Sequence, residues 1–106
     1  MLFRSPVRHL CQAMTELLNG ISPNNNVILG DFNINWLVET ERRPMYNLQE
    51  RDNGYKQLIS SYTTDNKTVI DHIYTNILHI DIHVQSGVLE TYFTDHEAVC
   101  ASFCTM

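Results

Sequence analysis

The sequence predicts an α+β fold in which an N-terminal helix covers a mainly antiparallel sheet. Apolar residues recur with helical spacing only near the N-terminus, whereas several later segments alternate between apolar and polar residues. The chain has 106 residues, of which 43% are hydrophobic, and this is enough for one small domain. We therefore expect a single domain over residues 1–106.

The helix is expected over residues 6–19. Ser5 is a suitable N-cap and Pro6 is favourable at the first helical position, while Asn19 and Gly20 provide the stop. The apolar positions at i, i+4, i+7 and i+8 are Leu10, Met14, Leu17 and Leu18. This spacing gives the helix one apolar face for packing on a sheet.

The rest of the chain is expected to alternate between strands and turns. A short apolar strand at 27–29 follows a turn, residues 39–44 are charged and predict a surface loop ending at Pro44, and residues 45–51 predict a short helix. Further strands are expected to begin at Leu58 and to cover 68–75, 80–84 and 96–103, with a hydrophilic turn at 63–67.

The charge balance limits the binding partners. Twelve Asp and Glu against seven Lys and Arg give a net charge of −5, which counts against tight DNA binding by this chain alone. A metal-dependent nuclease remains compatible with this charge, because a bound cation offsets the acids locally.

Cysteine usage and hydropathy indicate the compartment. Three cysteines without a C-x-x-C pair favour a reduced setting, and the sequence contains neither a membrane-spanning apolar run nor a secretory leader. We expect an intracellular, non-secreted protein without a membrane partner; nucleus and cytoplasm both remain open.

Polar side chains stand at the ends or starts of three predicted strands. Asp31 and Asn33 follow the apolar run 27–29, Asp71 lies in the segment 68–75, and Asp95 and His96 precede the last strand. Strand ends hold side chains rigidly at the edge of a sheet, where catalytic groups are often placed. Simpler interpretations exist for each. Asp31 and Asn33 could be turn residues, Asp71 a solvent-facing strand residue, and Asp95 with His96 a surface turn with a capping acid. A zinc site is disfavoured, because His79 and His83 would lie about 13 Å apart on a strand.

The motifs Gly30-Asp31-Phe32-Asn33, Ile70-Asp71-His72-Ile73-Tyr74 and Thr94-Asp95-His96 resemble, in this order, the endonuclease/exonuclease/phosphatase superfamily with its deoxyribonuclease-like fold. The segments around them look most like the endonuclease domains of non-long-terminal-repeat retrotransposons. The resemblance covers about residues 8–104 and implies part of a four-layer α/β/β/α sandwich.

The resemblance also implies a role for each residue. Asp31 would position or deprotonate the attacking water, and Asn33 would help orient both the water and the phosphate. His96 would contact the scissile phosphate, oriented by a hydrogen bond with Asp71, and Asp95 would lie at the metal-binding end. The implied cofactor is Mg²⁺ or Mn²⁺, the implied substrate is DNA, and the implied partner is a reverse transcriptase domain of the parent element.

Several family features have no counterpart here. The early asparagine, the metal-binding glutamate and the mid-domain tyrosine or histidine cannot be assigned, so the chain resembles the C-terminal half of the fold, and Thr94 stands where serine is usual. Three interpretations follow: a truncated DNA endonuclease, an inactive remnant of that domain, or a phosphatase or lipid phosphodiesterase of the same fold. We also expect the isolated chain to be marginally stable, because one face of its sheet lacks a partner.

Overall fold

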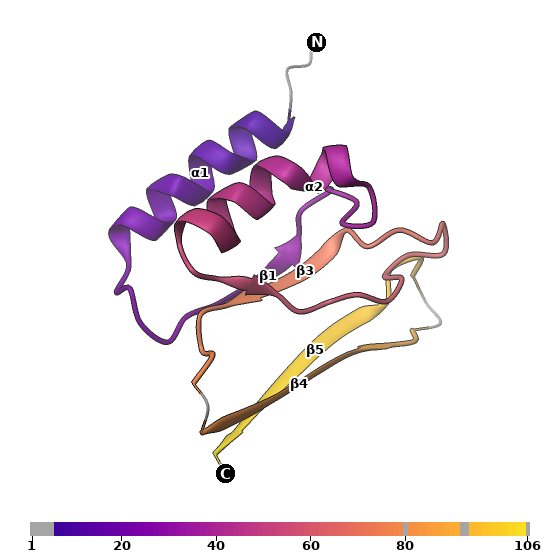
Figure 1. The fold of residues 1–106 in the computed structure, drawn as a ribbon. Helices are drawn as coiled ribbons and strands as arrows, with labels where there is room; N and C mark the ends of the chain where they lie inside the picture. Colours follow the sequence, from indigo (N-terminus) through magenta and orange to yellow (C-terminus); the bar gives the residue numbers. More distant parts are fainter. Residues whose placement is uncertain (1–5, 80, 92–93, 106) are drawn as a thin grey trace.

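Two helices cover one face of a three-stranded antiparallel sheet, and a two-stranded antiparallel sheet lies on its other face (Figure 1). The structure is a computed structural model that describes residues 6–79, 81–91 and 94–105. In chain order the elements are α1 (Pro6–Gly20), β1 (Val27–Asp31), α2 (Glu39–Tyr46), a π-helical segment (Asn47–Asp52), β2 (Lys56–Gln57), β3 (Asp71–Thr75), β4 (Ile82–Leu89) and β5 (Ala98–Thr105). The expected α+β class with antiparallel pairing is confirmed.

Strand β3 is the centre of the first sheet and sends alternate side chains to two cores. Tyr74 packs toward the helices with Met14 and Met45, and all three are buried. Ile73 points to the opposite face and packs with Val69, Ile59 and residues of β4 and β5. This period of two follows from strand geometry and fixes which face each neighbour of Ile73 must take.

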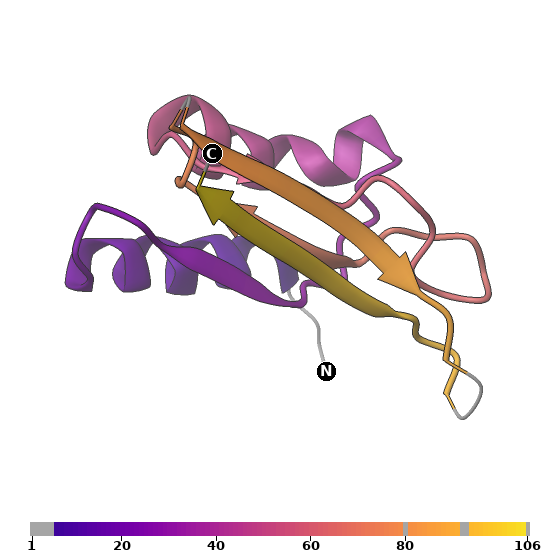
Figure 2. The ribbon, with the colours of Figure 1, turned by 90° about the horizontal axis from the view of Figure 1, so that it is seen from below.

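Strand β1 is an edge strand, and the second sheet does not cover it. Ile28 packs on the helix-side core, so Val27 and Leu29 face the other side, where Leu29 is 65% exposed. Seen from below in Figure 2, β1 is not hidden behind β5. The described residues thus form three layers; no described helix lies on the outer face of β4 and β5, where a four-layer sandwich would have one.

The expected surface loop at 39–44 is wrong, because this segment forms helix α2. Val38 C=O accepts hydrogen bonds from the backbone N–H of Glu41 and Arg42, each at 3.0 Å, and so starts the helix. Glu39 and Glu41 lie in the first turn, where the helix dipole favours acids. Pro44 lies inside α2, where it removes one intrahelical N–H donor; the regular helix ends two residues later and continues as a π-helical segment.

Two strands differ from expectation where side chains take over backbone hydrogen bonds. The strand expected to begin at Leu58 lies earlier, at Lys56–Gln57, and the Gln57 carboxamide bonds both the N–H and the C=O of Ile59 at 2.7 Å. The expected strand 68–75 begins only at Asp71, because the N–H of Val69 donates to Asn35 and that of Ile70 to the Thr63 hydroxyl. The last two strands lie two residues later than expected at their starts, and Ile80 is outside the described residues.

A helix that crosses a bilayer needs about 20 apolar residues. No helix in the described part of the chain meets this requirement.

The two cores give a matched stability test in one cross-strand pair. Leu29 and Ile73 face each other in the β1–β3 register, but Ile73 is 2% exposed and Leu29 is 65% exposed. We expect Ile73→Ala to lower the free energy of unfolding by about 2–5 kcal/mol, because it leaves a cavity. Leu29→Ala should lower it by less than about 1 kcal/mol. Urea unfolding of both variants checks this, and equal losses would contradict the assignment of the two positions.

Candidate active site

Two aspartates face each other at one end of the first sheet. Asp31 is the last residue of β1 and Asp71 is the first of β3, and the two are directly paired in the antiparallel register. Both lie on the face of Ile73, away from the helices, since alternate residues of a strand share a face. Like charges in this position repel, so the arrangement favours a cationic or hydrogen-bond-donating group between them.

His96 occupies that position from the other end of the chain. Its backbone forms an antiparallel bridge with Thr64, and the neighbouring Glu97 N–H donates to Thr63 C=O at 2.8 Å. The Asp65 N–H donates to Asp95 C=O at 3.1 Å, and the Thr91 hydroxyl donates to His96 C=O at 2.6 Å. The turn after residue 62 therefore holds the 95–97 segment at the edge of the sheet.

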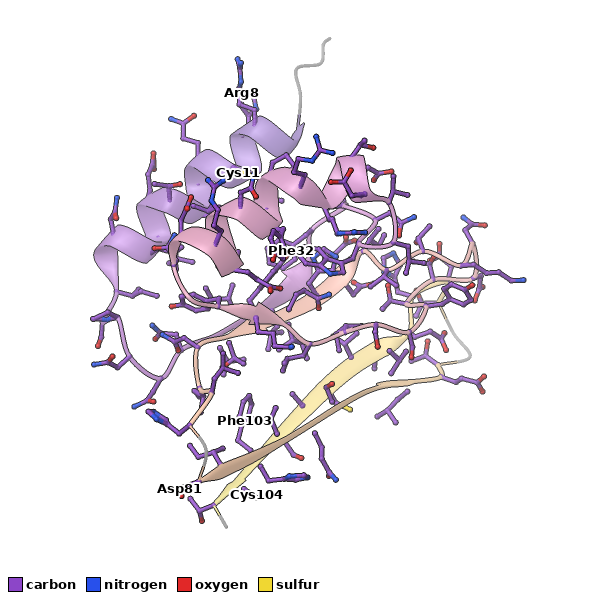
Figure 3. The ribbon with its side chains drawn as sticks, in the orientation of Figure 1. Arg8, Cys11, Phe32, Asp81, Phe103 and Cys104 are labelled. Carbon is purple, nitrogen blue, oxygen red and sulfur yellow. The ribbon has the colours of Figure 1, made fainter. Side chains whose placement is uncertain are left out.

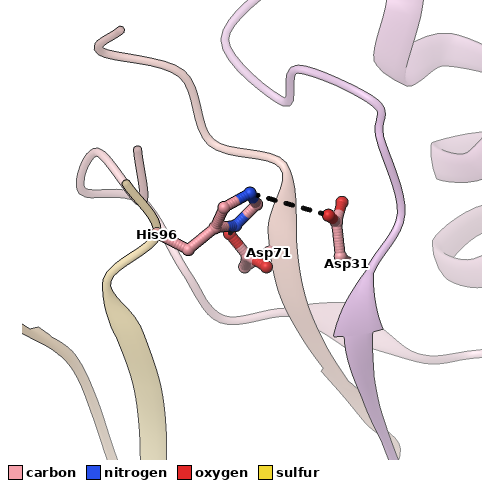
Figure 4. Close-up of side chains that lie close together, drawn as sticks. All are labelled: Asp31, Asp71 and His96. Atoms are coloured by element: carbon pink, nitrogen blue, oxygen red, sulfur yellow. Dashed lines mark hydrogen bonds and ion pairs between the residues drawn. The ribbon is translucent and has the colours of Figure 1, made fainter. Parts of the chain in front are cut away.

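The imidazole of His96 lies between the two carboxylates (Figure 4). Its Nδ1 is 2.9 Å from Asp71 Oδ2, and its Nε2 is 3.9 Å from Asp31 Oδ2. A carboxylate only accepts, so Nδ1 carries the proton of the shorter contact and donates to Asp71. The expected hydrogen bond between Asp71 and His96 is confirmed, and it turns Nε2 toward Asp31 and solvent.

These contacts favour the protonated form of His96. The hydrogen bond to Asp71 is the main cause of its raised pKa, and the negative charges of Asp71, Asp31 and Asp95 add to it. The side chain is 34% exposed, so a ligand in solution can reach it. A cationic imidazole at this point is suited to contact an anion.

Asn33 belongs to the same site through its backbone. Its φ of 52° is left-handed, which asparagine tolerates well, and its N–H donates to Asp31 Oδ1 at 2.9 Å. The Asp31 side chain is thereby held by the short turn that it forms with the Asn33 backbone. Asn33, Asp95 and His96 line a common groove with a volume of about 340 Å³.

Neutral polar side chains make up much of this groove, and one further acid lines it. The remaining lining residues are Asn35, Glu41, Thr64, Asn66, Thr68 and Ile70. Glu41 is absent from the sequence-based candidates, because its segment was expected to be a loop. The sequence feature that could have indicated it is the pair of acids Glu39 and Glu41, which is typical of the first turn of a helix. Its Oε1 accepts the Asn35 N–H at 3.0 Å.

The structure thus brings all five sequence-based candidates to one end of the sheet. Asp31, Asp71 and His96 each offer a potential ligand atom, and these atoms lie within 4.8 Å of one another. Asn33 and Asp95 line the groove beside His96. Among the described residues, these three form the cluster of potential ligand side chains that could hold a metal ion. Asp95 is not part of this cluster.

A second histidine next to Asp71 has a structural role. His72 is fully buried, with its Nε2 2.9 Å from the carbonyl oxygens of both Ile34 and Val69. Nε2 therefore carries the proton, and Nδ1 accepts from the Tyr74 hydroxyl at 2.8 Å. Burial lowers the pKa of His72, so its ring stays neutral and its nitrogens are occupied.

Aromatic contacts complete the support for the loop that follows β1. Phe32 stacks on the His72 ring at a centroid distance of 5.2 Å, and Trp36 meets it edge-on at the same distance. Figure 3 shows Phe32 in the layer between the helices and the first sheet. Because Phe32 and Ile34 are anchored inward, the intervening Asn33 is presented to the groove.

Comparison of the chain with protein-family models, with curated proteins and with solved structures found no match.

The pKa values of the two histidines should be shifted in opposite directions from the usual 6.5, upward for His96 and downward for His72. The raised pKa of His96 means that its stabilising contribution is complete below about pH 6.5 and is lost as the pH rises through the folded-state pKa. For His72 the contribution is complete above about pH 6.5 and is lost as the pH falls toward its lowered pKa. We expect an NMR titration of the ring nitrogens to show both shifts.

Asp71→Asn is the matched variant for this titration. It should lower the pKa of His96 toward 6.5 while that of His72 stays low, because the His72 shift comes mainly from burial. A His96 midpoint at or below 6.5 in the parent chain would contradict the Asp71 contact.

Proposed function

We propose that this chain carries the catalytic half-site of a metal-dependent phosphodiesterase of the endonuclease/exonuclease/phosphatase type. The observation that supports this most is the position of His96, which is hydrogen-bonded to Asp71, lies 3.9 Å from Asp31 and lines an open groove. Hydrolysis of a phosphodiester requires a positioned water and stabilisation of the negative charge that develops on the phosphate. The site has a group suited to each of these tasks.

Asp31 is the group for the water. It is 49% exposed, and one of its oxygens is held by the Asn33 N–H. The other oxygen can accept a proton or a hydrogen bond from a water molecule. Asn33, two residues after Asp31, lines the groove and adds a carboxamide that can donate to a phosphate oxygen or orient that water.

His96 is the group for the phosphate. In its protonated form Nδ1–H is committed to Asp71, so Nε2–H remains to donate to a phosphate oxygen. Asp71 is a positioning residue in this scheme, because it fixes the ring orientation and favours the charged form.

The donor set suits a hard divalent cation. Asp95 and Glu41 supply carboxylates, the asparagines supply carboxamide oxygens, and no thiol lines the groove. Mg²⁺ and Mn²⁺ prefer such oxygen ligands. We assign Asp95 as the residue that would hold the ion; when bound, it would neutralise charge on the phosphate oxygens.

We further propose that the substrate is DNA and that the chain derives from a retroelement endonuclease, whose parent polypeptide would also carry a reverse transcriptase. The uncovered face of β1, with Leu29 exposed, supports a complete domain in which further strands continue this sheet into a four-layer sandwich. In that arrangement the groove would gain a second wall.

An inactive remnant of the same domain is the second candidate, and the charge of the groove favours it. None of the groove-lining residues is Lys or Arg, and the net charge of the chain is −5. A polyanionic substrate gains little electrostatic attraction under these conditions.

A plasmid-nicking assay tests both candidates. We expect the purified chain with Mg²⁺ to nick DNA very weakly or not at all, and addition of an N-terminal half from a related endonuclease to restore cleavage. In the restored complex, Asp31→Ala and His96→Asn should each lower the rate by about 10²–10³-fold. Asp81→Asn is the control for loss of a carboxylate, because Asp81 lies at the far end of β4 (Figure 3).

The outcomes separate the proposals. Strong nicking by the 106-residue chain alone that is lost in Asp31→Ala would refute the half-site and remnant interpretations. Failure to cleave plasmid DNA or a small phosphodiester such as bis(p-nitrophenyl) phosphate, with any added half, would refute the phosphodiesterase and leave the remnant.

A further inference from the structure

We propose that Asp31 and His96 form a binding site for a borderline-soft divalent ion such as Zn²⁺, distinct from the oxygen-lined Mg²⁺ position at Asp95. The ligands are the Nε2 of His96, which releases its proton to solvent when the ion binds, and the carboxylate of Asp31, with Asp71 behind the imidazole. Occupation of this site would exclude phosphate from His96.

The spacing of the two ligand atoms suits an ion between them. Zn²⁺ binds imidazole nitrogen and carboxylate oxygen at about 2.0–2.2 Å. The separation of 3.9 Å between Nε2 and Asp31 Oδ2 is shorter than two such bonds end to end, so one ion can contact both atoms. Small rotations of Asp31 then bring the angle closer to tetrahedral.

The contact of Asp71 is the outer interaction that such sites require. Metal-binding histidines usually donate their other ring N–H to a carboxylate, which fixes the tautomer and raises the basicity of the ligand nitrogen. His96 makes this contact at 2.9 Å through Nδ1. The ring is therefore already oriented with Nε2 outward before any ion arrives.

Access and ligand type decide which ion binds. The side chains of Asp31 and His96 are 49% and 34% exposed, which leaves room for water to complete the coordination. Imidazole favours Zn²⁺ over Mg²⁺, whose preferred ligands are oxygens. The Mg²⁺ of the proposed reaction should therefore compete poorly for Nε2.

The expected consequence is inhibition, and only this part rests on the proposed function. With Nε2 bound to the ion, His96 has no proton to donate to a phosphate oxygen. Asp31 is occupied at the same time and cannot position a water. Zinc would then suppress hydrolysis even in saturating Mg²⁺.

Calorimetric titration with ZnCl₂ tests the site without any reference to activity. The parent for the test is the full chain with Cys100→Ser and Cys104→Ser, because these thiols are exposed and Cys104 faces His83 across β4 and β5. We expect one Zn²⁺ per chain, with a tenfold excess of Mg²⁺ changing the affinity by less than threefold. Nitrogen NMR should show the Nε2 resonance of His96 shifting on binding.

Three variants and one control define the ligands. His96→Gln should abolish binding, Asp31→Asn should weaken it at least tenfold, and Asp71→Asn should weaken it by 10–100-fold as an outer partner. His83→Gln removes an exposed histidine of β4 and should leave the affinity unchanged. Circular dichroism of each variant checks that the fold is retained.

Binding that survives His96→Gln in a folded chain, or no binding by the parent, would overturn the site. If zinc binds as described but no phosphodiester is cleaved by the restored complex, the zinc site stands and the proposed function fails. Cleavage that is insensitive to zinc at saturating occupancy would overturn the inhibition.

Discussion

The buried hydrogen bonds of His72 are the interaction on which the site depends. Its Nε2–H holds the carbonyls of Ile34 and Val69 together, and its Nδ1 is satisfied by Tyr74. Unpaired buried polar groups are costly, so the loop after β1 and the segment before β3 cannot separate without losing these bonds. Since neighbouring strand residues point to opposite faces, anchoring His72 on one face presents Asp71 on the other.

Along β3, residues that pack in the helix-side core therefore alternate with residues that face the second sheet and the candidate site. Tyr74 and His72 build the helix-side core, whereas Ile73 and Asp71 serve the second sheet and the site. The cost of this arrangement is two carboxylates paired across β1 and β3, which repel. His96 offsets this repulsion, and its pKa is raised by the hydrogen bond to Asp71 and by the negative charges of the surrounding aspartates. A local feature that opposes stability yet is supported by its surroundings is typical of functional sites.

The sequence alone predicted the local features well. The helix 6–19 rested on periodicity within the segment, and the observed Pro6–Gly20 follows it closely. The grouping of the three acids followed from their positions at strand ends. The failures had two causes. Asn35 and Thr63, which lie outside the strand, take the hydrogen bonds that would have extended β3. The Val38 carbonyl starts a local helix in a charged segment that Pro44 had suggested was a loop. Glu41 could not be placed in the groove until that helix was known.

Within the proposed function, the charges around His96 favour a bound cation beside an anionic substrate. Asp31, Asp71 and Asp95 all act on this one imidazole, and Glu41 lines the same groove. A single imidazolium offsets one of these four acids, so an approaching phosphodiester would meet net negative charge. Coulomb repulsion at such short range is weakly screened by salt. The charge count at the site is therefore a second argument, beside the chemistry of phosphate, for the metal dependence that we propose.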